Sequence, residues 1–441
     1  MPDPAAAAAI PPSTPALMAA LAPGPQGSQG QPVALGLPAP VDLDDLLEPF
    51  ARRGVDLGLE RVQAALAEGG HPECRFAAVQ VAGTNGKGSI CTLLHAILRA
   101  AGLRCASYRS PHLVSWCERI QLDDAWISPA QLRADLARWQ PIGRHHQLTP
   151  FELLTAAAFD RFASEAPDLV ILEVGLGGRL DATTAHPQRS LLGFGSIGLD
   201  HREHLGDTLT AIAHEKAAVM APGSLAFSAP QSPEVAAVLT AEASRRGCEL
   251  RWLEPLATPA AGGPPLGLAG TWQRSNGAVA LAMAQALAAR GWPIDAVAIA
   301  SGLAAARWPG RLERRRWQGR ELLLDGAHNP PAAVALRREL DGQQGRRWLL
   351  GMQRHKQAPE LLDALLAPGD RLAVVAIPAH VSWSAADLQA ERPSLADRIE
   401  AIADPVAGLN WLTAPGPLPV VTGSLHLLGA LIPLLDPLEP G

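Results

Sequence analysis

The chain has 441 residues, of which 48% are hydrophobic and 18% are charged, and its formal net charge is -6. This length predicts two or three domains, and the apolar fraction is large enough to bury extensive cores. A mildly acidic chain lacks the basic surface that neutralises phosphates, and no apolar run reaches the roughly 18 residues of a membrane span, so we expect neither a nucleic-acid nor a membrane partner.

The N-terminal segment and the cysteines indicate the cellular compartment. Residues 1–40 consist mainly of Ala, Pro, Gly, Gln and Leu, with no Lys or Arg. A secretory signal needs a basic n-region and transit peptides are usually rich in Arg. We therefore interpret 1–40 as a disordered extension with one short helix near 16–21. The five cysteines are widely spaced and form no CxxC pair, which indicates reduced thiols in a cytoplasmic protein.

From residue 41 onward, short apolar runs alternate with longer amphipathic stretches, which is typical of an α/β protein with mostly parallel strands. The first strand, 76–81, leads into a glycine-rich turn, and a helix over 89–101 follows it. Further strands are predicted over 168–173 and 191–197, and further helices over 211–220, 276–287 and 294–306.

A second α/β block begins near Arg311, with predicted strands over 321–324, 347–350, 371–377 and 418–421. The turn residues Trp308, Pro309 and Gly310 mark a boundary. We expect a large domain over 41–308 and a smaller Rossmann-like domain over 309–441. Ligands of open parallel sheets bind beyond the carboxyl ends of the strands, and the candidate motifs lie at such ends.

The strongest motif is the glycine-rich loop between the first strand and its helix, Gly83-Thr84-Asn85-Gly86-Lys87-Gly88-Ser89. Glycines let backbone N–H groups converge on phosphate oxygens, and the helix N-terminus adds a partial positive charge. Lys87 would reach the β- and γ-phosphates of a nucleotide, and Ser89 would help to orient them. The loop departs from the general phosphate-loop pattern, with Val81 in place of its first glycine and Gly88 in place of Ser or Thr. The alternative is a plain turn between strand and helix.

This loop resembles that of the folylpolyglutamate synthase/dihydrofolate synthase family, within the Mur-ligase group of ATP-dependent amide ligases. The resemblance covers roughly 41–430, and its other motifs are 57–62 (LGLERV), 110–113 (SPHL), 172–183 (LEVGLGGRLDAT), 200–201 (DH), 215–216 (EK), 309–311 (PGR), 324–330 (LDGAHNP) and 422–424 (TGS). It implies a P-loop-containing, Mur-ligase-like domain with a parallel sheet, followed by the smaller Rossmann-like domain.

The resemblance also implies a magnesium site. Glu173 ends a buried strand, where a lone carboxylate is costly unless it binds something. By resemblance Glu173 and Ser110 are metal ligands, and His201 is a ligand of a second Mg²⁺ with a catalytic role. Lys216 matches a carbamylated catalytic lysine of the family. From the sequence alone, the alternatives are an exposed strand end for Glu173, a structural histidine for His201 and a surface lysine for Lys216.

The remaining contacts are implied for ATP and for the pterin. The ATP-binding residues would be those of the loop with Asn276, Arg311, Asp325 and His328, although Asp325 also suits a turn before Gly326. Thr149, Pro150 and Phe151 match a segment of the pterin pocket, where an aromatic face stacks on a pterin. The alternative for Phe151 is a core residue at a helix start.

Two positions and one loop depart from the family's pattern. Thr184 stands where the family has Asn, Gly195 stands where it has Thr, and the loop 353–356 (QRHK) lacks a common Asp.

The predicted reaction joins L-glutamate to a folate, to dihydropteroate, or to both. ATP phosphorylates the substrate carboxylate, and the glutamate amine then displaces phosphate from the acyl phosphate. We expect the enzyme to be a monomer. One rival is a peptidoglycan-type Mur ligase, which needs a nucleotide-sugar domain before the loop, whereas only about 40 residues separate 1–40 from Gly83. The other is a non-catalytic nucleotide-binding regulatory module.

Overall fold

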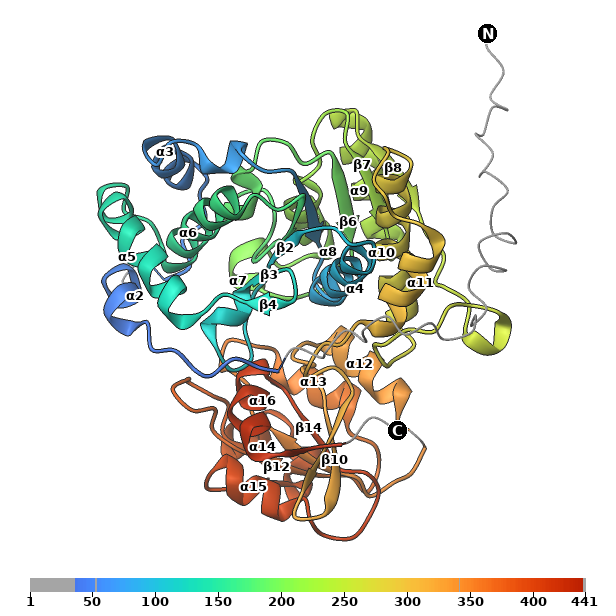
Figure 1. The fold of residues 1–441 in the computed structure, drawn as a ribbon. Coiled ribbons are helices and arrows are strands. Elements are labelled where there is room, and N and C mark those ends of the chain that lie inside the picture. The colour runs from blue at the N-terminus through green and yellow to red at the C-terminus, as the bar shows by residue number, and fades with distance from the viewer. Residues whose placement is uncertain (1–35, 52–53, 341, 439–441) are drawn as a thin grey trace.

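The computed structural model describes residues 36–51, 54–340 and 342–438, and it contains two α/β units that each surround one sheet (Figure 1). Most of the extension predicted over 1–40, including the helix near 16–21, lies outside the described residues. The strands of the first sheet end at Trp252 and those of the second begin at Glu313. The predicted α/β fold class is confirmed.

The larger sheet has eight strands in the order β4-β3-β2-β5-β1-β6-β7-β8. The six strands from β2 to β8 in this order are parallel, while β3 and β4 form an antiparallel hairpin at one edge. The bounds are β1 (Ala78–Ala82), β2 (Cys105–Tyr108), β3 (Ile120–Leu122), β4 (Ala125–Trp126), β5 (Leu169–Glu173), β6 (Leu191–Phe194), β7 (Leu225–Ser228) and β8 (Glu249–Trp252).

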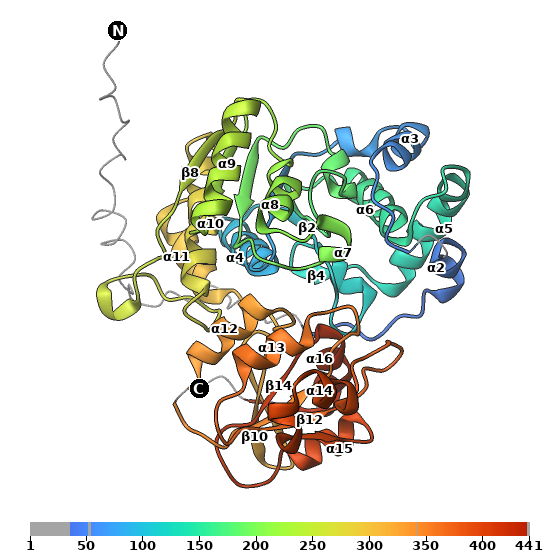
Figure 2. The same ribbon diagram turned by 180° about the vertical axis from the view of Figure 1, so that it is seen from behind.

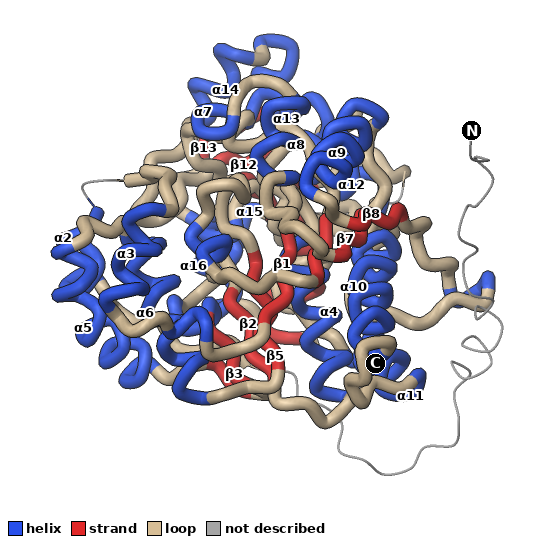
Figure 3. The backbone as a smooth tube through the Cα atoms, turned by 90° about the horizontal axis from the view of Figure 1, so that it is seen from above, coloured by secondary structure: helices blue, strands red, loops and turns tan. Residues whose placement is uncertain are grey.

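Helices cover both faces of this sheet, because alternate residues of a strand point to opposite sides. Val79 and Val81 of β1 pack with α4, α10 and α11, while Ala78 packs with α3, α5 and α6. Seen from above, the strands lie between α6 and the pair α4 and α10 (Figure 3). The helices of this unit are α2 (Asp44–Ala51), α3 (Glu60–Glu68), α4 (Lys87–Ala100), α5 (Pro129–His145), α6 (Pro150–Glu165), α7 (Arg202–Leu205), α8 (Leu209–Ala217), α9 (Pro233–Arg246), α10 (Gln273–Ala288) and α11 (Ala296–Ala305).

The smaller sheet has seven strands in the order β13-β12-β11-β14-β10-β9-β15. Its first five strands are parallel, as in a Rossmann-like fold, whereas β9 and β15 are antiparallel at one edge. The strands are β9 (Glu313–Trp317), β10 (Arg320–Leu324), β11 (Arg347–Leu350), β12 (Arg371–Val374), β13 (Ile399–Ala401), β14 (Val420–Thr422) and β15 (Asp436–Pro437), and the helices are α12 (Pro330–Glu339), α13 (Ala358–Leu365), α14 (Ala385–Glu391), α15 (Pro405–Trp411) and α16 (Leu425–Leu431).

The predicted elements agree with the observed ones to within a few residues. The strand predicted over 347–350 has the bounds of β11, whereas the strands predicted over 191–197 and 371–377 end three residues earlier. The chain passes from one unit to the other between Ala305 and Glu313, and α7 and α8 of the first unit lie above α12 and α13 of the second (Figure 2). The domain limits at 308 and 309 stay a prediction.

All five cysteines are free, and Cys74 is the exposed one. No helix in the described part of the chain has the length and apolarity needed to cross a membrane.

Candidate active site

A cavity of about 260 Å³ lies where the carboxyl ends of β1, β2, β5 and β6 face the C-terminal unit. It brings together most of the residues predicted to form the site, although these come from segments far apart in the chain. The predicted residues that line it are Thr84, Asn85, Gly86, Lys87, Gly88, Ser89, Ser110, Glu173, His201, Lys216, Asn276, Arg311, Asp325 and His328. Their individual roles stay predictions.

The glycine-rich loop forms the floor of the cavity. It connects Ala82 at the end of β1 to Lys87 at the start of α4, and the backbone N–H groups of Thr84 and Asn85 donate to the Ser196 carbonyl. Gly86 caps the helix with φ of 87°, and a Cβ there would lie 2.3 Å from Asn276 Oδ1. The loop therefore requires glycine at this position for both its backbone conformation and its contact with α10.

Gly195, one of the departures from the family's pattern, lies directly against this loop. A Cβ on Gly195 would lie 2.3 Å from the Asn85 carbonyl oxygen, and a Cβ on Gly83 would lie 3.1 Å from Gly195 N. Threonine could not occupy position 195 with this backbone. The departure thus allows a closer approach of the loop to the segment after β6.

Lys87 folds back over the loop that precedes it. Its ammonium donates to the carbonyl oxygens of Gly83, at 3.1 Å, and Thr84, at 3.2 Å. Ser89 is buried, and its hydroxyl accepts a hydrogen bond from Gln273 Nε2. A positive charge and a helix N-terminus therefore meet at one point of the cavity, which is the arrangement that binds phosphate.

Glu173 ends β5 inside the cavity with only 4% of its surface exposed. Burial raises the pKa of its carboxyl group, while the charges of Lys87 and Arg109 and a hydrogen bond with the Ser110 backbone act in the opposite direction. The Glu173 carboxylate and Ser110 line the same cavity as the phosphate loop and offer hard oxygen donors there. This donor set fits a divalent cation such as Mg²⁺.

Lys216 is not the surface lysine that its sequence context alone indicated. It lies on α8 with 5% exposure and lines the cavity. Burial, and then the positive charge of Lys87, lower its pKa to about 7. In a large fraction of the molecules, the Lys216 side chain therefore ends in a neutral amine near neutral pH.

Asp200 and Lys356 join the two units through a buried ion pair. Lys356 Nζ lies 2.6 Å from Asp200 Oδ1, with 9% and 7% of the side chains exposed, and Asn329 Nδ2 donates to Asp200 Oδ2. Burial alone would raise the pKa of Asp200, but His328, whose Nε2 lies 3.6 Å away, and the Lys356 ammonium hold it well below its usual range. Lys356 also lies 3.1 Å from His201 Nε2, so that nitrogen can reach a metal ion only if Lys356 moves.

Two of the predicted ATP contacts are already engaged by other groups. The carboxylate oxygens of Asp325 accept hydrogen bonds from the backbone of Leu312 and Ala327, as expected of a residue that begins a turn. His328 Nδ1 is hydrogen-bonded to the Gly326 carbonyl. Both side chains still line the cavity.

Thr149 and Phe151 are not among the residues that line the cavity. Thr149 is the N-cap of α6, and its hydroxyl accepts from Glu152 N in a capping box. Phe151 is partly buried against the core and lies next to Gly175, where a Cβ would be 2.6 Å from its ring. The capping pattern Thr-x-x-Glu was legible in the sequence and explains Thr149 without a ligand.

The role of Lys356 was missed by the sequence reasoning, although one compositional signal pointed to it. The chain has only three lysines, Lys87, Lys216 and Lys356. All three lie at this site, the first two in the cavity and the third at its edge beside Asp200. Because nearly all basic residues are arginines, the presence of all three lysines at one site was a signal in the sequence that ammonium or amine groups gather there.

A family profile and the sequences of known proteins point to the same family. A family profile described as "Dihydrofolate synthetase, C-terminal domain" matches residues 311–434. A relative from Bacillus subtilis, "Dihydrofolate synthase/folylpolyglutamate synthase", is 35% identical over 305 residues, which are 63% of this chain and 70% of the relative. A folylpolyglutamate synthase from Arabidopsis thaliana is also 35% identical, but the match spans 58% of this chain and only 49% of that protein.

Solved structures with the same fold extend over most of the chain. E. coli FolC in complex with DHPP and ADP has a TM-score of 0.77 at 27% identity and covers 92% of this chain and 99% of its own. A bifunctional folylpolyglutamate synthase/dihydrofolate synthase with Mn, AMPPNP and L-glutamate bound has a TM-score of 0.76 at 28% identity, with the same coverage.

The substitution Lys356→Met should weaken the contact between the two units. It leaves Asp200 buried without its ammonium partner, which costs about 3–5 kcal/mol in such pairs. The ATP-dependent turnover should fall, and the loss should shrink at low pH, where protonation neutralises the unpaired carboxylate of Asp200. The measurement is the pH profile of turnover together with the apparent midpoint of thermal unfolding.

The matched control is Arg354→Met in the same loop. Arg354 pairs with Asp387 at 2.7 Å, but both side chains are more than 40% exposed, so this loss should cost about 1 kcal/mol or less. Equal effects of the two substitutions would contradict the role given to the Lys356–Asp200 pair.

Lys216 should make the stability of the ligand-free protein depend on pH. Its pKa is about 7 in the folded chain, whereas an unfolded lysine has a pKa of about 10.4. Between these values the unfolded state binds more protons, so stability should rise as the pH increases from 7 toward 10. Lys216→Met should remove this part of the rise, as measured by denaturant unfolding in CO₂-free buffer. A slope unchanged by the substitution would argue against the lowered pKa.

Proposed function

Since the chain belongs to the folylpolyglutamate synthase/dihydrofolate synthase family, we propose that it joins L-glutamate to a pterin-containing carboxylate at the expense of ATP. Support for the family comes from the Bacillus subtilis relative, of which the match covers more than two thirds. The observation that carries the function is the cavity in which the phosphate loop, Glu173 and Lys216 face Arg311 and His328 of the second unit. A nucleotide-binding regulatory module would have no need of a buried carboxylate and a buried amine beside its phosphate loop.

The proposed reaction has two steps. The substrate carboxylate attacks the γ-phosphorus of ATP, which gives an acyl phosphate and ADP. The amine of glutamate then attacks the acyl carbon, the amide bond forms and inorganic phosphate leaves with the bonding electron pair. The protein's main contributions are to position the reactants and to stabilise the negative charge that develops.

Individual residues would contribute as follows. The amides of the loop that follow Asn85 and the Lys87 ammonium would hold the β- and γ-phosphates, since the amides of Thr84 and Asn85 donate to Ser196. Arg311 would supply a second cation from the opposite side of the cavity. Mg²⁺, held by Glu173 and Ser110 with His201 nearby, would supply charge neutralisation at the phosphates. The Asp200–Lys356 pair keeps the two units in contact, which excludes water that would otherwise hydrolyse the acyl phosphate.

L-glutamate would enter through an adjoining cavity of about 440 Å³. This second cavity shares Asp200, His201 and His328 with the first, and Arg202 and Lys356 also line it. Three carboxylates, those of Asp200, Glu203 and Asp207, also line it. Such a mixed lining suits an amino acid that carries an ammonium group and two carboxylates. The amine of the bound amino acid would then face the phosphorylated carboxylate across the shared residues.

The test of this function is ADP release with ATP, Mg²⁺ and L-glutamate. ADP should form when dihydropteroate or a reduced folate is present and should not form with a UDP-muramoyl peptide. Assaying each pterin alone distinguishes dihydrofolate synthase from folylpolyglutamate synthase activity. The control is Lys87→Ala, which should lower turnover by two or more decades at about 1.4 kcal/mol each. Turnover with the muramoyl compound and not with the pterins would assign the chain to peptidoglycan synthesis instead.

We also propose that Lys216 carries a carbamate. Only a neutral amine reacts with CO₂, and burial with a pKa of about 7 makes Lys216 such an amine. The nitrogen forms a bond to the carbon of CO₂ and releases one proton, so a cation that would repel Mg²⁺ becomes an anion with two hard oxygens. Mg²⁺ bound nearby would favour the anionic form.

The small number of lysines makes the carbamate directly observable. With ¹³C-labelled CO₂, carbon NMR of the wild-type protein should show a carbamate resonance that Lys216→Ala lacks and Lys356→Arg retains. The carbamate of the N-terminal amine should be common to all three proteins. Lys216→Ala should also lose turnover, and short carboxylic acids should restore part of it. A spectrum unchanged by Lys216→Ala would remove the proposal.

A further inference from the structure

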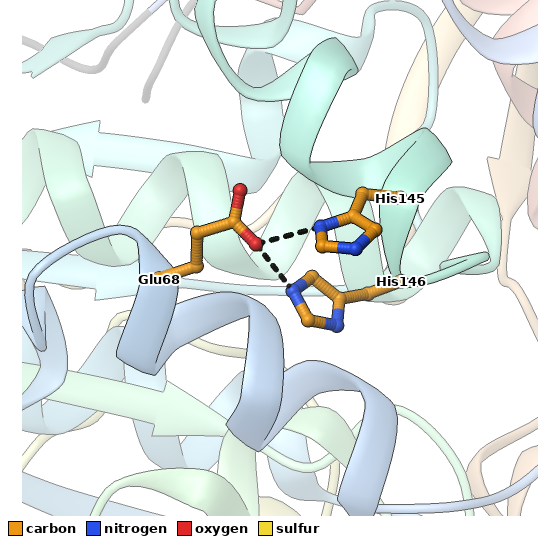
Figure 4. Close-up of side chains that lie close together, drawn as sticks. All are labelled: Glu68, His145 and His146. Carbon is orange, nitrogen blue, oxygen red and sulfur yellow. Dashed lines mark hydrogen bonds and ion pairs between the residues drawn. The ribbon is translucent and has the colours of Figure 1, made fainter.

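Two adjacent histidines and a glutamate form a compact cluster on the large unit, outside the cavity and the adjoining one. Glu68 Oε2 lies 2.8 Å from His145 Nδ1 and 2.7 Å from His146 Nε2 (Figure 4). The glutamate is the last residue of α3, and the histidines end α5, about 80 positions along the chain. Three donor atoms from two helices thus converge on one point at the protein surface.

The backbone around this cluster is held in place before any ligand arrives. Gly69 follows Glu68, and a Cβ there would lie 2.2 Å from the ring of Trp139, so glycine lets the end of α3 pack directly on α5. Beyond His146, Gln147 is left-handed with φ of 54°, and Leu148 N donates to the Gly143 carbonyl. This is the Schellman pattern of a helix end, which fixes the direction in which both histidines leave α5.

The electrostatics of the cluster favour a cation. The C-terminal ends of α3 and α5 both point here, and each carries the partial negative charge of unpaired carbonyl groups. The Glu68 carboxylate, which is hydrogen-bonded to both histidines, adds its own negative charge. Arg144, the nearest arginine in the chain, is hydrogen-bonded to Gln140 instead.

We propose that Glu68, His145 and His146 bind a divalent transition-metal ion of borderline softness, such as Zn²⁺, which clamps α3 to α5. Two imidazole nitrogens and one carboxylate oxygen suit Zn²⁺, Co²⁺ or Ni²⁺, and water completes the coordination at an exposed site. Tetrahedral ligands at about 2.0–2.1 Å from a metal lie about 3.4 Å apart. The Glu68 oxygen therefore needs to move away from each histidine nitrogen by roughly 0.6–0.7 Å to admit the ion.

This site differs in chemistry from the predicted magnesium site, whose donors are mainly oxygens. A second cluster of possible metal ligands, His71, Glu73 and Cys74, follows closely in the chain, and it has a thiol donor. Those three residues lie within four consecutive positions of the chain, whereas the Glu68 site connects two helices. Metal binding at the Glu68 site should therefore stabilise the fold, which gives a readout independent of catalysis.

The experiment uses the full-length protein with excess Mg²⁺ to fill the magnesium site. Zn²⁺ is titrated by calorimetry into the wild-type protein, into the double variant His145→Ala/His146→Ala and into the control variant His71→Ala/Cys74→Ser. His145 is 70% exposed and His146 is 20% exposed, so the double variant should fold, which circular dichroism checks. Thermal unfolding with and without Zn²⁺, and the visible absorption of bound Co²⁺, are recorded for the same three proteins.

We expect the wild-type protein and the control variant to bind Zn²⁺ with micromolar or tighter affinity at this site and to unfold at a higher temperature when it is bound. The double variant should bind at least tenfold more weakly, lose the thermal shift and lose the absorption of four-coordinate Co²⁺. Equal Zn²⁺ binding by the double variant and the wild-type protein would overturn the proposal. So would loss of the binding event in the control variant, since that result would assign the ion to His71 and Cys74.

Discussion

The ion pair between Lys356 and Asp200 is the contact on which the arrangement of the site depends. Its two atoms lie 2.6 Å apart with both side chains more than 90% buried, and each partner without the other would be an uncompensated charge. Asn85 and Asn329 add a reciprocal pair of amide hydrogen bonds across the same boundary. These contacts join the phosphate loop, which follows β1, to the segment that follows β10. The residues that hold the two units together are therefore also residues that line the cavity or the adjoining one.

The close approach of backbone segments is the second constraint. Gly86 and Gly195 leave no space for a Cβ between the loop, α10 and the segment after β6. Such packing brings N–H groups toward a common point without intervening side chains, as a phosphate site requires. The glycine at 195 lets the Asn85 carbonyl oxygen and the segment after β6 approach more closely than a residue with a Cβ would allow.

Lysine and arginine occupy different kinds of position in this protein. Buried amines cost folding free energy, because burial disfavours the charged form. Lys216 shows this cost in its lowered pKa, whereas the buried ammonium of Lys356 forms an ion pair with Asp200. Elsewhere the chain relies on arginine for its surface ion pairs, as in Arg99 with Asp124 and Arg392 with Asp363. The lysines are therefore confined to positions where a point charge, or a neutral amine that can react, has a chemical use.

The sequence alone indicated the α/β class, seven of the strands, four of the helices and the phosphate loop, because these follow from local periodicity and glycine positions. Most of the other residues predicted around the cavity came from the resemblance to the family. The strand at Arg347–Leu350 and the loop before Lys87 are examples. Only the tertiary structure decided the burial of Lys216, the partner of Asp200 and the use of Thr149 as a helix cap. It also decided the antiparallel edge made by β9 and β15. The physical reason is that burial and charge pairing depend on residues brought together across 100 or more positions, as with Asp200 and Lys356, 156 positions apart, and local patterns carry no record of such contacts.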